Sequence, residues 1–196
     1  EEMREAEGRR YGTRKKQKKD SGKRKTKWAK TVKNNWKELD QENASASHGS
    51  NLTIQNDNSI LASGATPPKE TYTVEATTKA SNIYAVRLET LLDDSWNEKL
   101  GRSSNGNFVL TEFELEYADE DSPEVYKKVS FVRAKVDTDQ KDYRIPGAID
   151  GKAETGWAPN GHGAGGDRAA VFGASEPFGI AKRTKLPQTD PTGRRT

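Results

Sequence analysis

The sequence contains no cysteine and only two histidines. The lack of cysteine excludes disulfides, thiolate nucleophiles and zinc sites built on thiolates, and it leaves the cellular compartment undecided. His48 and His162 have no nucleophile pattern near them, and haem attachment through a pair of cysteines is impossible. We therefore predict that this chain is not an enzyme.

Apolar residues are scarce as well, at 31% of the chain against 32% charged residues. The 196 residues can hold one domain of about 150 residues, and the remainder is predicted to be solvated. No run of 18 apolar residues is available to span a membrane, and no apolar block follows the charged N-terminus as in a signal peptide. Because the chain begins at Glu1 rather than Met, we expect it to be a piece of a longer protein.

Positive charge is concentrated near the N-terminus. Residues 9–37 carry a net charge of +13, whereas residues 38–196 sum to −7. We predict that residues 1–35 form a basic arm or linker, partly disordered or helical, because Trp28 and Val32 begin a helical stripe. Two roles stay open for this arm: a solvated linker, or binding of nucleic acid or an anionic surface by counterion release.

From residue 50 onward, apolar and polar residues alternate in short runs separated by turn residues. A period of two with one charged face is typical of half-buried antiparallel strands, so we predict an all-β sandwich or barrel. The frame of alternation changes between residues 129 and 136, which predicts either a bulge or a strand covered on both sides. Strands are expected at residues 52–54, 59–61, 71–76, 84–92, 109–117, 129–136 and 169–172, with a turn at 56–58 and a further start of sheet at 36–39. The buried faces are expected to carry Tyr72, Val74 and Ala76, then Tyr84, Val86, Leu88 and Leu92, then Val109, Phe113, Leu115 and Tyr117.

The stretch from Ala148 to Trp157 combines a tight turn with a large aromatic residue. Asp150 can bond its own downstream backbone and Gly151 accepts a positive φ, so these two residues predict a turn. Trp157 is expected in the core beneath that turn.

Two blocks of sequence resemble a known module. The first block includes Arg87-Leu88-Glu89, Gly101-Arg102 and Asn105 to Glu112; the second runs from Ala148 to Trp157 and on to Ala170-Val171-Phe172. Together they resemble a β-sandwich module of large planctomycete multidomain proteins that carry a planctomycete-type cytochrome c domain and domains of unknown function. The second block alone is similar to the Asp-Gly…Thr-x-Trp motif of discoidin-type, galactose-binding-like modules.

The resemblance covers residues 36–186 and implies an antiparallel jelly-roll β-sandwich. We predict that residues 187–196 after it form a disordered tail. It also implies a non-catalytic binding module, often for carbohydrate, within a secreted or cell-surface bacterial protein that is periplasmic or extracellular. Two departures stand out: the closing strand of the family breaks at Thr184 to Pro187, and the basic arm has no counterpart. The alternatives are a structural spacer against catalytic neighbour domains, or binding of nucleic acid or an anionic surface through the arm.

The discoidin-type resemblance further implies a structural calcium ion in the Asp-Gly loop. Asp150 would supply a carboxylate, while Lys152 and Thr155 would supply carbonyl oxygens and Thr155 its hydroxyl as well. The ammonium of Lys152 is unfavourable beside calcium, and Glu154 is the residue available to compensate. The alternative is a plain turn closed by the Asp150 side chain.

A carbohydrate site would need an aromatic ring for stacking and planar polar groups in nearby loops. Loop residues of these types are Trp96, Arg102, Asn105, Asn160 and His162. Each has a structural alternative, since loops contain such residues routinely, and Arg102 could instead pair with Glu112. The glycine-rich loop around His162 lacks the Lys-Ser/Thr ending and the following helix of a phosphate-binding loop.

Overall fold

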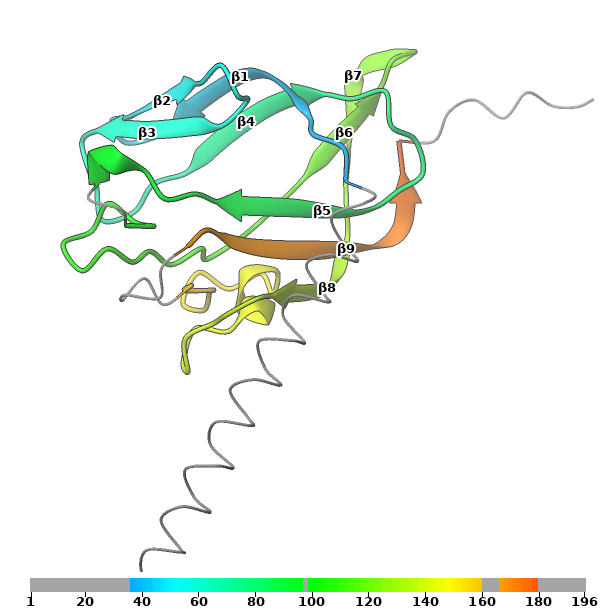
Figure 1. Ribbon diagram of the computed structural model, residues 1–196. Helices are drawn as coiled ribbons and strands as arrows, with labels where there is room; N and C mark the ends of the chain where they lie inside the picture. The colour runs from blue at the N-terminus through cyan, green and yellow to red at the C-terminus, as the bar shows by residue number, and fades with distance from the viewer. Residues whose placement is uncertain (1–35, 97–98, 160–165, 180–196) are drawn as a thin grey trace, which may run out of the picture. The chain divides into compact units, whose positions relative to one another are not determined.

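The computed structural model describes residues 36–96, 99–159 and 166–179. Over these residues the chain is strand and loop, with two short 3-10 turns, η1 (Asp94–Trp96) and η2 (Ile145–Ala148) (Figure 1). Every pairing between the described strands is antiparallel, so the prediction of an all-β antiparallel fold is confirmed. The predicted arm at 1–35 and tail at 187–196 lie outside the described residues.

The described residues divide into two compact units, and the first comprises residues 36–64 and 69–78. It contains a hairpin of β2 (Ser50–Ile54) and β3 (Ile60–Gly64). The predicted turn between them is present: Asn58 adopts a φ of 64°, and Asp57 Oδ1 accepts hydrogen bonds from the Ser59 hydroxyl (2.7 Å) and the Ser59 N–H (3.1 Å). These two bonds, the hydroxyl first, lower the pKa of Asp57.

The same unit holds β1 (Asp40–Ala46) against β4 (Tyr72–Thr77). The expectation of sheet at residues 36–39 is wrong, since those residues have no regular structure and β1 starts at Asp40. β4 lies where it was predicted, but the burial assigned to it is wrong: Tyr72 is 49% and Val74 45% exposed. The alternation of apolar and polar residues therefore predicted the position of β4 but not which of its side chains are buried.

The second unit, which comprises the described residues of 65–68 and 79–179, is built on a three-stranded sheet ordered β5-β9-β8. Its strands are β5 (Ile83–Thr90), β8 (Phe131–Val136) and the central β9 (Arg168–Phe178). Register places Leu88, Ala170 and Val136 side by side, and these residues face the core. Because β9 pairs on both edges and is buried, its small and aromatic residues hold the sheet together (Figure 1).

Irregular pairing explains which apolar residues leave the core. The predicted bulge in residues 129–136 is confirmed by a register shift between Phe131 and Arg133, which leaves Val132 57% exposed. A second shift between Ile83 and Ala85 turns Tyr84 outward, at 66% exposed, so the burial predicted for Tyr84 is wrong.

The strand expected at 109–117 is shorter than predicted. Regular pairing is confined to the hairpin of β6 (Glu116–Asp119) and β7 (Ser122–Lys128), and Val109 is 43% exposed rather than buried. Phe113 and Leu115 nevertheless pack into the core, because the extended chain before β6 keeps the alternation and is held by isolated backbone hydrogen bonds rather than by a continuous partner strand.

The main core cluster is centred on Trp157, whose side chain is fully buried as predicted. The ring meets Phe108 edge-on with centroids 5.7 Å apart, and its Nε1–H donates to Thr138 O at 3.0 Å. Phe113 stacks on Phe172 at 4.1 Å in the same cluster. This core supports the loop that ends at Trp157.

Candidate functional site

The loop from Ala148 to Trp157 is fixed at both ends by backbone hydrogen bonds. Phe113 N–H donates to Ala148 O at 2.7 Å, and Leu110 and Trp157 exchange two bonds of 2.8 and 2.9 Å. Gly156 allows this close approach, since a Cβ there would lie 2.7 Å from Leu110 O. The loop is therefore a rigid platform on the core of the second unit.

Inside the loop, oxygen atoms gather around the hydroxyl of Thr155. Its Oγ1 lies 2.8 Å from Asp150 Oδ1, 3.1 Å from Lys152 O and 3.3 Å from Gly147 O. Asp150 Oδ1 also accepts the N–H of Lys152 at 3.0 Å, which closes the turn expected from the Asp-Gly pair. One hydroxyl proton can serve only one of the three acceptors, so the loop presents more oxygen lone pairs than donors.

A second carboxylate reaches the loop from far away in the sequence. Glu112 is half-buried, and its Oε1 accepts the N–H of Lys152 at 2.9 Å, beside Asp150. Glu154, the residue that the sequence offered for this role, is exposed and makes no hydrogen bond or ion pair within the described part of the chain. Glu112 and Lys152 are 40 positions apart in the sequence, so only folding brings them into contact.

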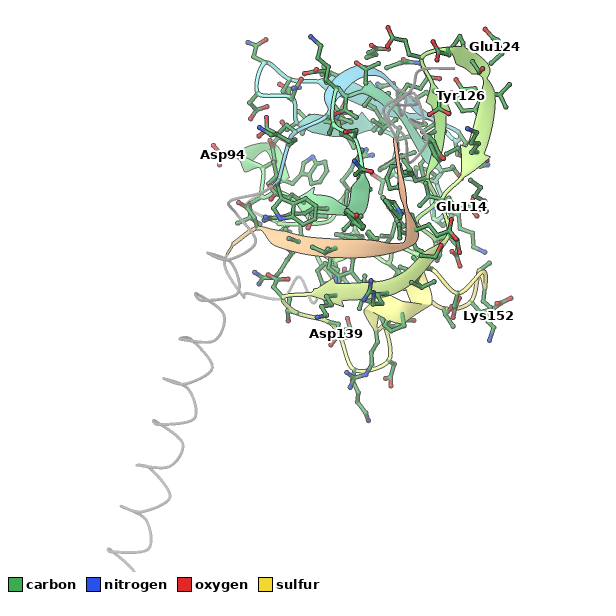
Figure 2. All side chains as sticks on the ribbon, turned by 90° about the vertical axis from the view of Figure 1, so that its right-hand side faces the viewer. Asp94, Glu114, Glu124, Tyr126, Asp139 and Lys152 are labelled. Carbon is green, nitrogen blue, oxygen red and sulfur yellow. The ribbon has the colours of Figure 1, made fainter. Side chains whose placement is uncertain are left out.

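The arrangement fits a hard cation better than the loop sequence alone indicated. Calcium takes six to eight oxygen ligands at 2.3–2.6 Å, and three candidate oxygens lie 2.8–3.3 Å from Thr155 Oγ1. The side chain of Lys152 extends into solvent at the outer edge of the molecule, so its ammonium need not face the oxygens (Figure 2). Within the described ranges, no group of three or more His, Cys, Asp or Glu side chains is arranged to hold a metal ion, so carbonyl oxygens would have to complete the set.

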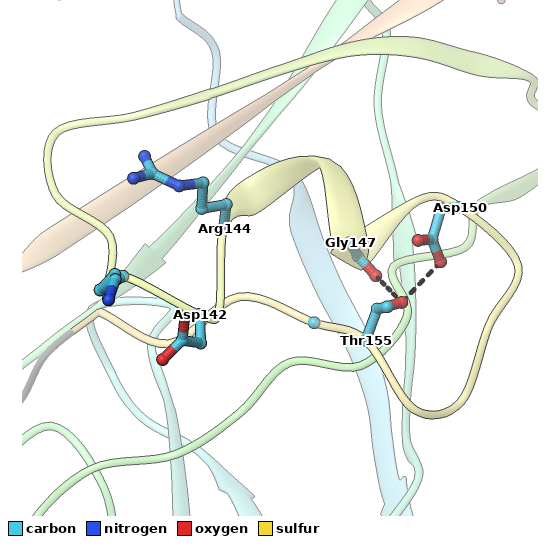
Figure 3. Close-up of a pocket in the computed structure, with 7 residues that line it drawn as sticks. Asp142, Arg144, Gly147, Asp150 and Thr155 are labelled. Atoms are coloured by element: carbon cyan, nitrogen blue, oxygen red, sulfur yellow. Dashed lines mark hydrogen bonds between the residues drawn. The ribbon is translucent and has the colours of Figure 1, made fainter.

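An open cleft of about 240 Å³ adjoins this loop. One wall comes from the turn after β8 and the other from η2 and the Asp150 loop (Figure 3). The bridge between Gln140 and Tyr143 shapes the first wall. The lining residues are Lys141, Asp142, Arg144, Gly147, Asp150, Thr155 and Gly156.

Of the five predicted carbohydrate ligands, the structure brings Trp96 and Arg102 into contact, and Asn105 lies further along the same loop. The guanidinium of Arg102 lies over the Trp96 ring, 5.9 Å from its centroid, and Arg102 Nη2 donates to Ala65 O at 2.7 Å. Asn105 Oδ1 accepts from the Ser103 hydroxyl at 2.6 Å and from Asn107 N–H at 3.1 Å. These contacts give all three residues a structural role, and their binding role stays a prediction.

The other two predicted ligands, Asn160 and His162, lie outside the described residues.

The first unit contains a polar cluster that the sequence did not indicate. The carboxylate of Glu70 accepts bonds from the Ser47 hydroxyl (3.0 Å), the His48 N–H and the Ser50 N–H (3.1 Å). Burial raises the pKa of Glu70, but bonds from Ser50, His48 and Ser47 outweigh it and lower the pKa to about 2. Ser47 Oγ also accepts from Thr71 N–H at 3.0 Å and lies 2.6 Å from His48 Nδ1, so the cluster braces a turn.

The chain matches no protein-family model, no curated protein and no solved structure. None of the helices formed by the described residues is long and apolar enough to cross a membrane.

Proposed function

We propose that this chain is a non-catalytic, carbohydrate-binding module with a galactose-binding-like jelly roll, part of a larger secreted or cell-surface bacterial protein. The observation that supports it best is the polar cleft beside the Asp150 loop. Backbone hydrogen bonds tie both walls of that cleft to the chain around the buried Trp157, so the backbone of the cleft is held in place before any ligand arrives.

We further propose that the Asp150 loop holds a structural calcium ion. Asp150, Glu112, Thr155 and the carbonyl oxygens of Gly147 and Lys152 would hold it. A bound cation would satisfy the surplus of oxygen lone pairs and fix the wall of the cleft that Asp150 and Thr155 form.

The calcium proposal is tested by thermal unfolding of the chelator-treated chain with increasing calcium. Binding to the folded state alone stabilises by ~2.7 kcal/mol at a calcium concentration 100 times the Kd. We expect calcium to stabilise the wild type by this amount and to stabilise Asp150→Asn much less. Glu154→Gln is the control, because it removes the same negative charge at a residue outside the proposed site, and calcium should stabilise it as much as the wild type. Equal calcium responses in all three chains would refute the assignment.

The carbohydrate proposal is tested with a glycan array and by affinity electrophoresis in gels that contain soluble polysaccharides. We expect retention by at least one polysaccharide, weakened when Asp150 is changed to Asn. An intact, folded chain that retains no glycan in either assay contradicts the proposal.

A structural spacer is the second candidate, and one observation favours it. All seven residues of β7 are exposed, including Val125 at 56% and Tyr126 at 66% (Figure 2). Exposed apolar residues on a strand with one unpaired edge suit packing against a neighbouring domain. If the chain is a spacer, the double variant Val125→Ser with Tyr126→Ser should be more soluble than the isolated wild-type chain. Neither the variant nor the wild type should then retain any glycan.

A further inference from the structure

The side chains of the cleft indicate which kind of sugar it would take. None of its seven lining residues is aromatic, so it offers no ring on which a neutral sugar could stack. Four of them are charged, namely Lys141, Asp142, Arg144 and Asp150, and Figure 3 shows Asp142 and Arg144 apart from Asp150. Recognition in this cleft must therefore depend on hydrogen bonds and charge.

The two carboxylates are not equally available to a ligand. Asp150 Oδ1 already accepts the Lys152 N–H at 3.0 Å and the Thr155 hydroxyl at 2.8 Å. Asp142 is exposed and forms no hydrogen bond or ion pair with any other described residue. It therefore remains able to accept hydrogen bonds from ligand hydroxyls.

Lys141 and Arg144 keep most of their N–H donors available for a ligand. Arg144 Nη1 lies 3.7 Å from Asp139 Oδ1, which is a loose pair on a side chain that is 66% exposed. Within the described part of the chain, Lys141 has no carboxylate within 4 Å. Asp150 keeps its negative charge, so the four charged side chains of the cleft sum to zero, and Lys141 and Arg144 are the groups that can attract an anionic part of a ligand.

The size of the cleft limits the ligand to about one sugar ring. Its volume of about 240 Å³ equals that of ~8 water molecules at ~30 Å³ each. Guanidinium groups bind carboxylates through two parallel hydrogen bonds, and an ammonium adds a further charge-assisted bond. A ring that carries one carboxylate and several hydroxyls matches this donor and acceptor set.

We propose, resting on the proposed carbohydrate-binding function, that this cleft recognises a uronic acid residue of an acidic polysaccharide. Arg144 and Lys141 bind the sugar carboxylate, and Asp142 accepts hydrogen bonds from ring hydroxyls. The cleft is open, so neighbouring sugars of the polymer continue into solvent on either side.

The test is isothermal titration of the full chain with digalacturonate and, as the matched neutral ligand, galactobiose. We expect digalacturonate to bind at least 10-fold more tightly, with an advantage that shrinks as salt is raised. Lys141→Ala with Arg144→Ala should lower its affinity at least 10-fold and leave the weak neutral binding unchanged, because each charge-assisted bond contributes more than a neutral one. Arg144→Lys should lose part of the affinity, since it keeps the charge but not the paired geometry.

Lys152→Ala is the control for loss of one positive charge, because its side chain is exposed and does not line the cleft. All these side chains are exposed, and circular dichroism confirms that each variant is folded. Equal binding of the two ligands, or a loss in Lys152→Ala as large as in the double variant, overturns the uronate assignment and leaves the carbohydrate proposal standing. Failure to bind either ligand, together with an empty glycan array, overturns both.

Discussion

Replacement of Trp157 probes the support of the whole site. Trp157 is fully buried, bonds Thr138 O through its indole N–H and pairs edge-on with Phe108. Its backbone also exchanges two hydrogen bonds with Leu110, which any side chain at this position would keep. Trp157→Phe therefore removes the indole hydrogen bond and part of the ring without altering the backbone pairing.

The expected loss of stability follows from two terms. The indole hydrogen bond contributes ~1 kcal/mol net. Phenylalanine is ~40 Å³ smaller than tryptophan, and at ~24 cal/mol per Å³ the resulting cavity costs another ~1 kcal/mol. We expect Trp157→Phe to lose ~2 kcal/mol and Trp157→Ala ~3–5 kcal/mol, the range for buried aromatic truncations.

Urea unfolding followed by circular dichroism measures this loss. With a slope of ~2 kcal/mol per molar urea, the midpoint of Trp157→Phe should fall by ~1 M. The control is Trp96→Phe, because Trp96 is half-buried and its contact with Arg102 is worth ~0.5–1 kcal/mol. A midpoint unchanged in Trp157→Phe, or lowered more by Trp96→Phe, would show that the core is not centred where we place it.

Three further outcomes are expected. The pKa of Glu70 is lowered to about 2 from 4.5, so its contribution is present above pH 4.5 and is lost as the pH falls towards 2; Glu70→Gln should lower the urea midpoint at pH 7 and leave it unchanged near pH 2. Gly156→Ala should lose ~1–3 kcal/mol in the same assay, because its Cβ would lie 2.7 Å from the backbone oxygen of Leu110, whereas Gly173→Ala, with nothing closer than 3.5 Å, should be nearly neutral. Deletion of residues 1–35 should abolish any salt-sensitive DNA binding in gel-shift assays, and unchanged binding would remove the arm from consideration.

Local patterns predicted the features that local chemistry decides. The Asp-Gly pair gave a turn with Trp157 buried beside it, because turn geometry and the burial of a large ring depend on a few adjacent residues. The change of alternation frame near Phe131 likewise gave a bulge, since a shift of one residue moves side chains to the other face.

Features that depend on distant contacts were not predicted. β1 has the sequence DQENASA, which contains no apolar alternation, so only its pairing with β4 makes it a strand. Glu112 alternates with core residues like any solvent-facing residue of a strand, and the sequence does not show that its carboxylate bonds the Lys152 N–H. The cleft has the same origin: residues 141–144 contain no motif, and the fold alone places them opposite Asp150.

The central claim is that the cleft beside the Asp150 loop is the binding site of this chain. Its most direct test is a titration of the ¹⁵N-labelled chain with digalacturonate, followed by amide chemical shifts. We predict saturable shifts at Lys141, Asp142, Arg144 and Gly147 and across residues 150–156. Shifts confined to residues 96–105, or no shift at millimolar ligand, would contradict it.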